Sequence, residues 1–263
     1  MTVDPHVLFK EGEFTFRILS KEYRDEALVV LSRAFCTEPV CDAIAEIDPK
    51  MKTNFLDWVE FVDYWMDHCS TNGMSVVALR KLNNHKLANT LLYCISFDIL
   101  YRYLLFNADE KSHRIAGVFI VRDLLMKPPG FEEKYSRDEK TLTPWMQFLW
   151  HMDAEATKSK PELGEPGKAV DLWFLGVHPD FRGNKIANHL IRGILPLVKK
   201  SGFKYATIEA TSFFTSKAAA FNNFEAVYHE ETKNWKWKGK PLYVNPKPPH
   251  GTWTFWVKDL DTV

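Results

Sequence analysis

The chain has 263 residues, enough for one large domain or two small ones, and 46% of them are hydrophobic. A chain of this size and composition can bury a core without the disulfide staples that small secreted domains need. Its 34 basic and 34 acidic residues give a formal net charge of zero. This balance argues against nucleic acid as the main partner, because phosphate backbones bind to basic surfaces.

The first quarter of the chain predicts a strand followed by two helices. Residues 14–19 alternate in polarity as an opening strand does, and Ser20 is a candidate cap for the helix that follows. Apolar residues recur at helical intervals over residues 27–35. Pro39 ends this helix, because proline bars its continuation. A second helix, rich in aromatic residues, is predicted over residues 56–69.

Two further strands are predicted over residues 75–81 and 115–122, with an insertion between them at residues 82–112. This insertion contains the most apolar stretch of the chain. Asp98 and Arg102 interrupt that stretch, so we expect a buried strand and helix there instead of a membrane span.

The N-terminus lacks the basic-then-apolar pattern of a secretory signal. The cysteines form no Cys-x-x-Cys pair, which predicts no metal site. We therefore expect a cytoplasmic protein with reduced thiols and no membrane partner, and we favour a monomer. The four cysteines are Cys36, Cys41, Cys69 and Cys94.

The second half of the chain alternates strands and helices, which is typical of an α/β fold. Pro196 lies inside an apolar helical stripe and is expected to kink or shorten that helix. The predicted strands cover residues 170–177, 205–210, 226–229 and 252–258, and the predicted helices cover residues 140–156, 187–198 and 216–222.

One strand–turn–helix junction in this half is a candidate ligand-binding site. A strand ends at His178-Pro179, a turn with Arg182 and Gly183 follows, and an apolar helical stripe then begins. Such a turn aims unpaired backbone N–H groups at one point, and the helix N-terminus adds partial positive charge. This combination binds phosphate oxygens. The sequence thus predicts a phosphate-bearing ligand near residues 182–187.

The run from Val177 to Ala187 resembles the acetyl-CoA motif of the GNAT superfamily of N-acetyltransferases, Arg/Gln-x-x-Gly-x-Gly/Ala. Lys185 occupies a position where that family usually has glycine, and its side chain would either crowd the pyrophosphate or contact it. Asn223-Phe224 stands where the family usually has Gly-Phe. The resemblance is strongest over residues 170–229. It implies acetyl-CoA as co-substrate, bound by Leu175, Gly176, Val177, Arg182, Gly183, Asn184, Lys185, Ile186 and Ala187.

The resemblance also implies the fold. It predicts a single N-acetyltransferase-like domain over residues 1–263, of α/β class and with three layers. A mixed, twisted sheet would splay between its central parallel strands, which end at Val177 and near Ala210, with helices on both faces. The cofactor would sit in that split. The N–H groups of Leu175 to Val177 would stabilise the tetrahedral oxyanion.

The reaction needs a general base, because an amine with a pKa of roughly 10 must lose a proton before it attacks a thioester. Glu38 is the candidate. It lies in a Glu-Pro pair that resembles an element of the insect-type arylalkylamine N-acetyltransferases, in which the glutamate is assigned this role. The alternative is a solvated loop carboxylate, as most glutamates are. Asp42 and Glu46 are its nearest substitutes.

Two hydroxyls four residues apart are the other catalytic candidates. The same family commonly carries serines here, and counting back from Asn223-Phe224 places the pair at Thr211 and Thr215. A slip of one residue would make it Ser212 and Ser216. Serine and threonine are also the usual caps of a helix start, which is the alternative role.

The predicted function is acetyl transfer to a small primary amine, and the resemblance favours an arylalkylamine. Direct attack in a ternary complex is expected, because no cysteine lies in or after the cofactor motif. Transfer to polyamines, amino acids or peptide N-termini is one alternative, and a non-catalytic CoA- or protein-binding module is another. The aromatic side chains proposed to wall the amine pocket are Phe35, Trp58, Trp65, Trp145, Phe213 and Phe214.

Overall fold

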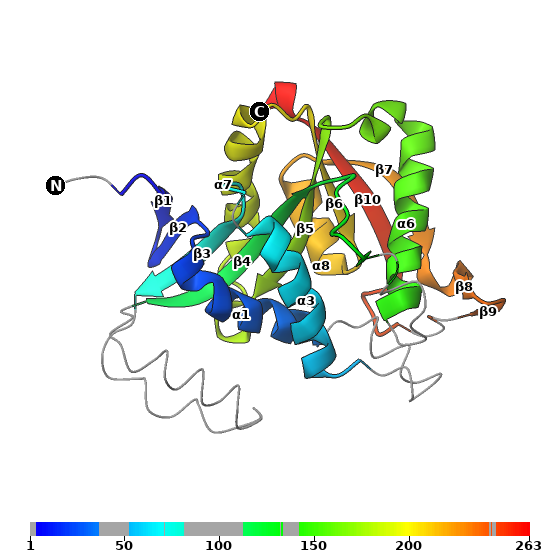
Figure 1. Ribbon diagram of the computed structural model, residues 1–263, viewed down its shortest axis with the longest axis horizontal. Helices are drawn as coiled ribbons and strands as arrows, with labels where there is room; N and C mark the ends of the chain where they lie inside the picture. Colours follow the sequence, from blue (N-terminus) through cyan, green and yellow to red (C-terminus); the bar gives the residue numbers. More distant parts are fainter. Residues whose placement is uncertain are drawn as a thin grey trace.

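An eight-stranded sheet forms the centre of the protein (Figure 1). The computed structural model describes residues 4–36, 53–70, 72–81, 113–131, 133, 142–241, 243 and 246–263. The strands of the sheet are β1 (Val7–Glu11), β2 (Phe14–Ile18), β3 (Val76–Lys81), β4 (His113–Asp123), β5 (Ala169–Val177), β6 (Tyr205–Ala210), β7 (Glu225–Glu231) and β10 (Thr252–Asp259). The helices are α1 (Arg24–Cys36), α3 (Phe55–Cys69), α6 (Leu142–Ser159), α7 (Ile186–Lys200) and α8 (Phe213–Phe221).

The strands lie in the order β1-β2-β3-β4-β5-β6-β10-β7. Every neighbouring pair is antiparallel except β5 and β6, which are parallel. A parallel pair needs a crossover connection, and α7 provides it. A short separate ribbon pairs β8 (Lys236–Trp237) with β9 (Lys240–Pro241).

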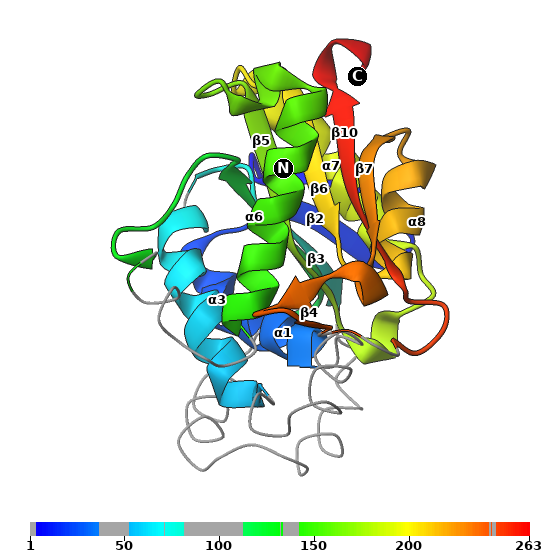
Figure 2. The ribbon, with the colours of Figure 1, turned by 90° about the vertical axis from the view of Figure 1, so that its right-hand side faces the viewer.

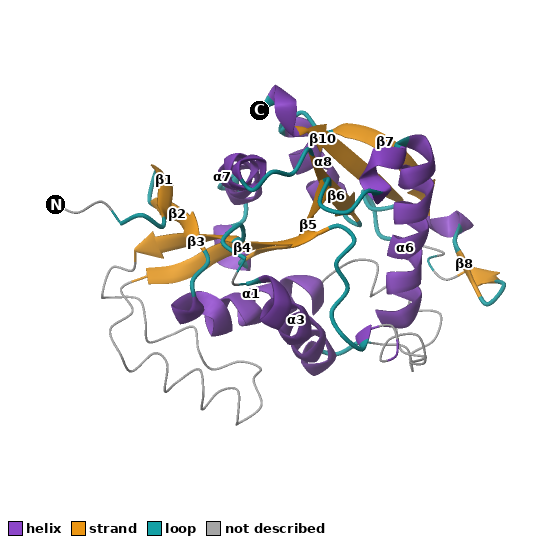
Figure 3. Ribbon diagram, turned by 45° about the horizontal axis from the view of Figure 1, so that its top comes forward, coloured by secondary structure: helices purple, strands orange, loops and turns teal. Residues whose placement is uncertain are grey.

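Helices cover both faces of the sheet and give the three layers that the resemblance implied (Figure 3). One core lies between the sheet and α1, α3 and α6, and the other lies between the sheet and α7 and α8. The alternation along β10 shows how the sequence assigns its faces. Trp253, Phe255 and Val257 are all buried in the core that contains α6, as their period of two predicts. Figure 2 shows α6 lying across this part of the sheet.

Gly117 on β4 lets the first turn of α7 approach the sheet closely. A Cβ added there would lie 2.7 Å from Ile186 Cγ2 and 3.2 Å from Leu190 Cδ1. Gly117→Ala is therefore expected to destabilise the fold by about 1–3 kcal/mol, because the packed core cannot absorb the extra carbon without shifting α7. Urea unfolding at constant m-value measures the loss.

Gly251→Ala is the matched control for this prediction, since its added Cβ would meet nothing nearer than 4.0 Å. It is expected to change the free energy of unfolding by less than about 0.5 kcal/mol. Equal effects of the two substitutions would contradict the close approach at β4.

Three details of the sequence prediction need correction. The helix with Pro196 is not shortened there, because α7 continues to Lys200. Ser20 precedes a short 3-10 turn at Lys21–Tyr23 and makes no side-chain capping bond. The alanine-rich helix starts three residues earlier than expected, at Phe213. The remaining predicted elements in the described residues are confirmed within a few residues, and none of the described helices is long and apolar enough to cross a membrane.

Candidate active site

The two parallel strands at the centre of the sheet separate after a short pairing. Their ladder joins only Ala169–Asp171 of β5 to Tyr205–Thr207 of β6. Beyond this point β5 continues to Val177 and β6 continues to Ala210 without pairing to each other. Leu172 to Val177 therefore present one backbone edge that no strand of the described chain satisfies, which is where the resemblance places the cofactor.

A β-bulge on β5 accompanies this separation. Ile120 of β4 faces Phe174, whereas the next residue, Val121, faces Leu172, so Trp173 is the extra residue. The bulge breaks the alternation of faces: Trp173 and Phe174 both lie in the core on the α1, α3 and α6 side. Bulges bend a strand and re-aim its side chains. Here the bulge turns an indole toward the opening between β5 and β6.

The turn at the start of α7 leaves its backbone N–H groups available. Among the described residues, none of the N–H groups of residues 183–187 has a hydrogen-bond partner, and the helix has no side-chain cap. Arg182 and Lys185 are exposed beside them. This set of free amides at a helix N-terminus, flanked by two cations, fits the phosphate oxygens of a CoA-type ligand.

Lys185 adopts the left-handed backbone conformation, with φ of 56°. This is the conformation that glycine favours, and an L-residue pays roughly 1–2 kcal/mol to adopt it. The turn therefore keeps the backbone path expected for glycine although its residue is lysine. The exposed side chain leaves the N–H groups uncovered within the described structure.

Asn223 repeats this pattern at the end of α8, with φ of 57°. Its N–H donates to the carbonyl of Ala220 at 3.0 Å, and the N–H of Phe224 donates to the carbonyl of Ala219 at 3.1 Å. These two bonds form a Schellman motif, whose left-handed residue is usually glycine or asparagine. Asparagine thus replaces glycine in the Gly-Phe position without a change of backbone.

A cavity with an empty volume of about 450 Å³ lies where β5 and β6 separate. Its lining comes from both cores, so the cavity lies at the split, where the two cores meet. This volume includes open solvent at the mouth of the cavity. The lining residues are Phe35, Phe119, Trp145, Leu149, Leu172, Trp173, Leu175, Ile208, Glu209, Thr211 and Thr215.

The predicted hydroxyl pairs fall into different environments. Thr211 and Thr215 line the cavity. Ser212 caps α8, since its Oγ accepts the N–H of Thr215 at 3.2 Å and lies 2.9 Å from Thr215 Oγ1. The Ser216 hydroxyl accepts the indole N–H of Trp256 at 3.3 Å. The geometry therefore favours Thr211 and Thr215 as the pair facing a ligand.

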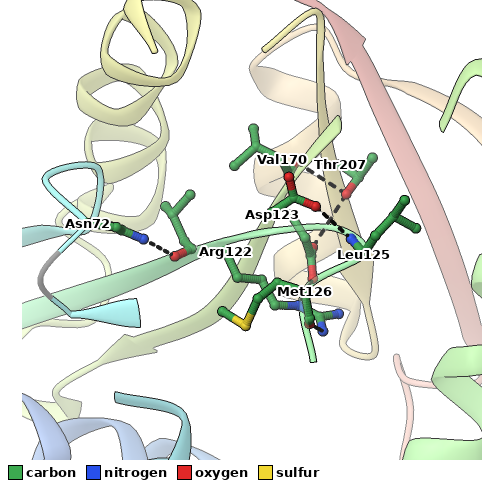
Figure 4. Close-up of polar contacts among 9 residues, drawn as sticks. Asn72, Arg122, Asp123, Leu125, Met126, Val170 and Thr207 are labelled. Carbon is green, nitrogen blue, oxygen red and sulfur yellow. Dashed lines mark hydrogen bonds and ion pairs between the residues drawn. The ribbon is translucent and has the colours of Figure 1, made fainter. Parts of the chain in front are cut away.

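A buried ion pair lies beside the cavity. Arg122 of β4 contacts Asp171 of β5, with 2.9 Å between Nε and Oδ2, and both side chains are almost fully buried. Arg122 Nη1 also donates to the carbonyl of Met126 at 3.3 Å (Figure 4). The guanidinium lies 3.8 Å from the ring centroid of Trp173, and Thr207 donates to Asp171 Oδ1 at 3.4 Å.

Two more acids join this cluster, and burial dominates the pKa of each. Desolvation raises the pKa of Asp171 to about 6 in spite of the attraction of Arg122. Burial also raises the pKa of Asp153 and raises that of Glu209 well above its usual value. A charged acid out of water prefers to take up a proton, which is the cause common to all three.

The predicted aromatic walls are only partly in place. Phe35 and Trp145 line the cavity, whereas Trp58 and Trp65 are fully buried in the core. Phe213 and Phe214 are exposed, at 38% and 65%, and do not line it.

The catalytic candidate Glu38 and its substitutes Asp42 and Glu46 lie outside the described residues, as does the predicted insertion at residues 82–112. Sequence reasoning missed Trp173 and Glu209 of the cavity lining. A signal for Glu209 was present, because a carboxylate inside an otherwise apolar strand next to the hydroxyl pair is unusual.

No protein-family model matches the sequence, and neither does any curated protein. Solved structures do match. Arylalkylamine N-acetyltransferase 2 from Aedes aegypti matches with a TM-score of 0.65 and 18% identity, over 95% of this chain and all of that one. The Drosophila melanogaster polyamine N-acetyltransferase matches with a TM-score of 0.61 and 12% identity, over 94% and 99%.

The C-terminal condensation domain of Ebony, solved with beta-alanyl-dopamine, matches with a TM-score of 0.68 and 13% identity, over 94% of this chain and 98% of that one. At such low sequence identities a match establishes the fold alone, and the reaction has to be argued from the residues of the site. The strand order, the split between β5 and β6 and these structural neighbours together show that the chain has the GNAT fold of the N-acetyltransferases.

Proposed function

We propose that the protein is an acetyl-CoA-dependent N-acetyltransferase that acts on a small primary amine of the arylalkylamine class. One observation carries the proposal: β5 borders a cavity with aromatic walls where it separates from β6, and it leads directly into the turn whose free amides start α7. A phosphate-bearing acyl carrier suits the first part, and an aromatic amine suits the second. Structural neighbours that are arylalkylamine or polyamine N-acetyltransferases support it.

On the cofactor side, acetyl-CoA would supply the acetyl group as an activated thioester. The N–H groups of residues 183–187 would bind its pyrophosphate, with Arg182 and Lys185 adding charge. The N–H groups of Leu175 to Val177 that face away from β4 would donate to the thioester oxygen, where negative charge develops during attack.

On the amine side, the rings of Phe35, Trp145 and Trp173 would hold the aromatic group. The hydroxyls of Thr211 and Thr215 are the donors proposed for the departing thiolate. Attack by the amine itself is favoured over a covalent acyl-enzyme. The buried Cys69 would be a poor nucleophile, because burial raises the pKa of its thiol to about 12 and keeps it protonated.

Calorimetric titration with acetyl-CoA, followed by a thiol-release assay on phenethylamine, spermidine, glycine and a peptide N-terminus, tests the proposal. Binding of acetyl-CoA with fastest turnover of phenethylamine is the expected result. Turnover of spermidine or the peptide alone would contradict the arylalkylamine assignment. Binding of acetyl-CoA without turnover of any amine would favour a non-catalytic module.

Glu38→Gln is expected to lower kcat by roughly 100-fold or more at neutral pH, because positioned proton transfer contributes about 10²–10⁴-fold to a rate. The loss is expected to shrink as the pH approaches the pKa of the amine, where free amine no longer needs a base. The pH dependence of kcat measures this. A variant with the parent's pH profile would exclude Glu38 as the base.

A further inference from the structure

Two carboxyl groups lie close together beside the cavity, and one of them lines it. Glu209 belongs to β6 and lines the cavity, whereas Asp153 belongs to α6, which packs across this end of the sheet (Figure 2). Each acid acts on the pKa of the other, so the two carboxyl groups lie within reach of each other. Both Glu209 oxygens and Asp153 Oδ1 are buried, and no N–H or hydroxyl donor of the described residues reaches them.

This arrangement requires a proton between the two acids. A hydrogen bond needs a donor, and two ionised carboxylates have none. Two negative charges in contact and out of water would also repel each other strongly, as in other carboxyl dyads that share one proton. With one shared proton, the pair carries a single negative charge.

The neighbouring charges do not cancel that negative charge. On β4, Arg122 is already paired with Asp171 of β5. Lys127, which follows β4, lowers the pKa of Asp153 by its charge, and this effect is smaller than the effect of burial. Arg122 thus forms an ion pair with only one of the three acids. Among the described residues, the Glu209–Asp153 pair forms no ion pair, so its negative charge is not compensated at the cavity.

Other polar atoms of the cavity also lack partners. The indole N–H groups of Trp145 and Trp173 are buried, line the same cavity and have no acceptor among the described residues. Buried polar groups are nearly always hydrogen-bonded in folded proteins, and each exception calls for an explanation. The indole donors call for an acceptor on a bound ligand. The anion calls for a cation and the aromatic walls call for an apolar part, so the cavity suits a cationic aromatic ligand.

We infer that the Glu209–Asp153 pair is the subsite that binds the ammonium group of the amine substrate. The inference rests on the proposed function. In it, the acid pair binds the charged ammonium group, and a separate general base removes its proton. An ammonium group has three N–H donors, so binding one of them here leaves another for a general base. The pair therefore selects cationic aromatic amines over neutral compounds of the same shape.

Binding of phenethylamine and of 2-phenylethanol, measured by calorimetry at pH 7, tests the inference without any need for turnover. The two ligands share their shape, and only the first carries a charge. The parent protein is expected to bind phenethylamine at least tenfold more tightly. The neutral double variant Asp153→Asn/Glu209→Gln is expected to lose this preference and to keep its affinity for 2-phenylethanol.

Glu155→Gln is the matched control, because Glu155 lies on the same helix and pairs with Lys158 at the surface. It is expected to keep the full preference for phenethylamine. Should the double variant not fold, Glu209→Gln and Asp153→Asn are examined singly. Each is expected to move the pH below which phenethylamine binding is lost, because each changes the proton affinity of the remaining acid.

A preference for phenethylamine that survives in the double variant would overturn the inference, and so would its absence in the parent. Failure of the proposed function looks different, since it shows as missing thiol release or missing acetyl-CoA affinity. Acetyl-CoA affinity is expected to be the same in the parent and in all these variants. In assays with turnover, the double variant is expected to raise KM more than it lowers kcat.

Discussion

Arg122→Met is expected to lower the free energy of unfolding by about 3–5 kcal/mol at pH 8, the usual cost of breaking a buried ion pair from one side. The substitution keeps an apolar stem between Trp173 and the sheet but removes the cation that faces the buried acids. Asp171 would then be buried as an unpaired charge. Urea denaturation at two pH values measures the effect.

The loss of free energy of unfolding in Arg122→Met is expected to be smaller at pH 5 than at pH 8. The direction of this pH dependence follows from the raised pKa values of the buried acids. An acid with a higher pKa in the folded state than in the unfolded state binds more protons when folded, so stability increases as the pH falls through the folded value. Removal of Arg122 would raise the pKa of Asp171 further, because the charge of Arg122 lowers it in the parent protein. Most of its carboxyl would then be neutral at pH 5.

Two controls accompany this variant. Arg122→Met/Asp171→Asn removes both charges and is expected to recover most of the stability. Arg80→Met breaks an exposed pair with Glu13 and is expected to cost no more than about 1 kcal/mol. Equal losses for Arg122→Met and Arg80→Met would contradict the role of the buried pair.

Arg182→Ala combined with Lys185→Glu is expected to weaken acetyl-CoA binding by roughly 10- to 100-fold, which is about 1.4–2.8 kcal/mol. Both side chains are exposed beside the free N–H groups at the start of α7. One cation is removed and the other is replaced by a charge that repels the diphosphate. Calorimetry at low and high salt measures the change, which is expected to shrink with salt.

Lys185→Gly separates charge from backbone conformation in the same turn. Glycine keeps the left-handed conformation without strain, so this variant is expected to gain up to about 1 kcal/mol of stability and to lose only a few-fold in affinity. Lys200→Ala, an exposed cation at the other end of α7, is expected to leave affinity unchanged. An unchanged affinity in the double variant as well would refute this placement of the diphosphate.

Local patterns in the sequence were sufficient to predict the strand and the helix on either side of the turn between β5 and α7. The apolar strand, the break at His178-Pro179 and the apolar stripe of α7 each depend on neighbours a few residues apart. Polar alternation likewise predicted β2 and β10. The helix around Pro196 was the exception: Pro196 lies on the exposed face of α7, and the buried residues Leu195 and Val198 keep the helix packed on the sheet past it.

The pair of acids beside the cavity could not be predicted in this way. Glu209 and Asp153 lie on different elements, and their proximity depends on how α6 packs over β6. The bulge at Trp173 depends on the register between β4 and β5, which no pattern within β5 records. Burial, which controls the protonation of these acids, is likewise a property of the folded chain alone.

Lys185 and Asn223 both adopt the left-handed backbone conformation. The turn before α7 and the turn after α8 therefore depend on this conformation more than on the presence of glycine. A search that demands glycine at these places would pass over a chain such as this one. Scanning backbones for a positive φ directly ahead of a helix whose leading amides stand open would retrieve it. Distant chains with this fold are thus better sought by the backbone conformation of the turn before α7 than by its amino-acid sequence.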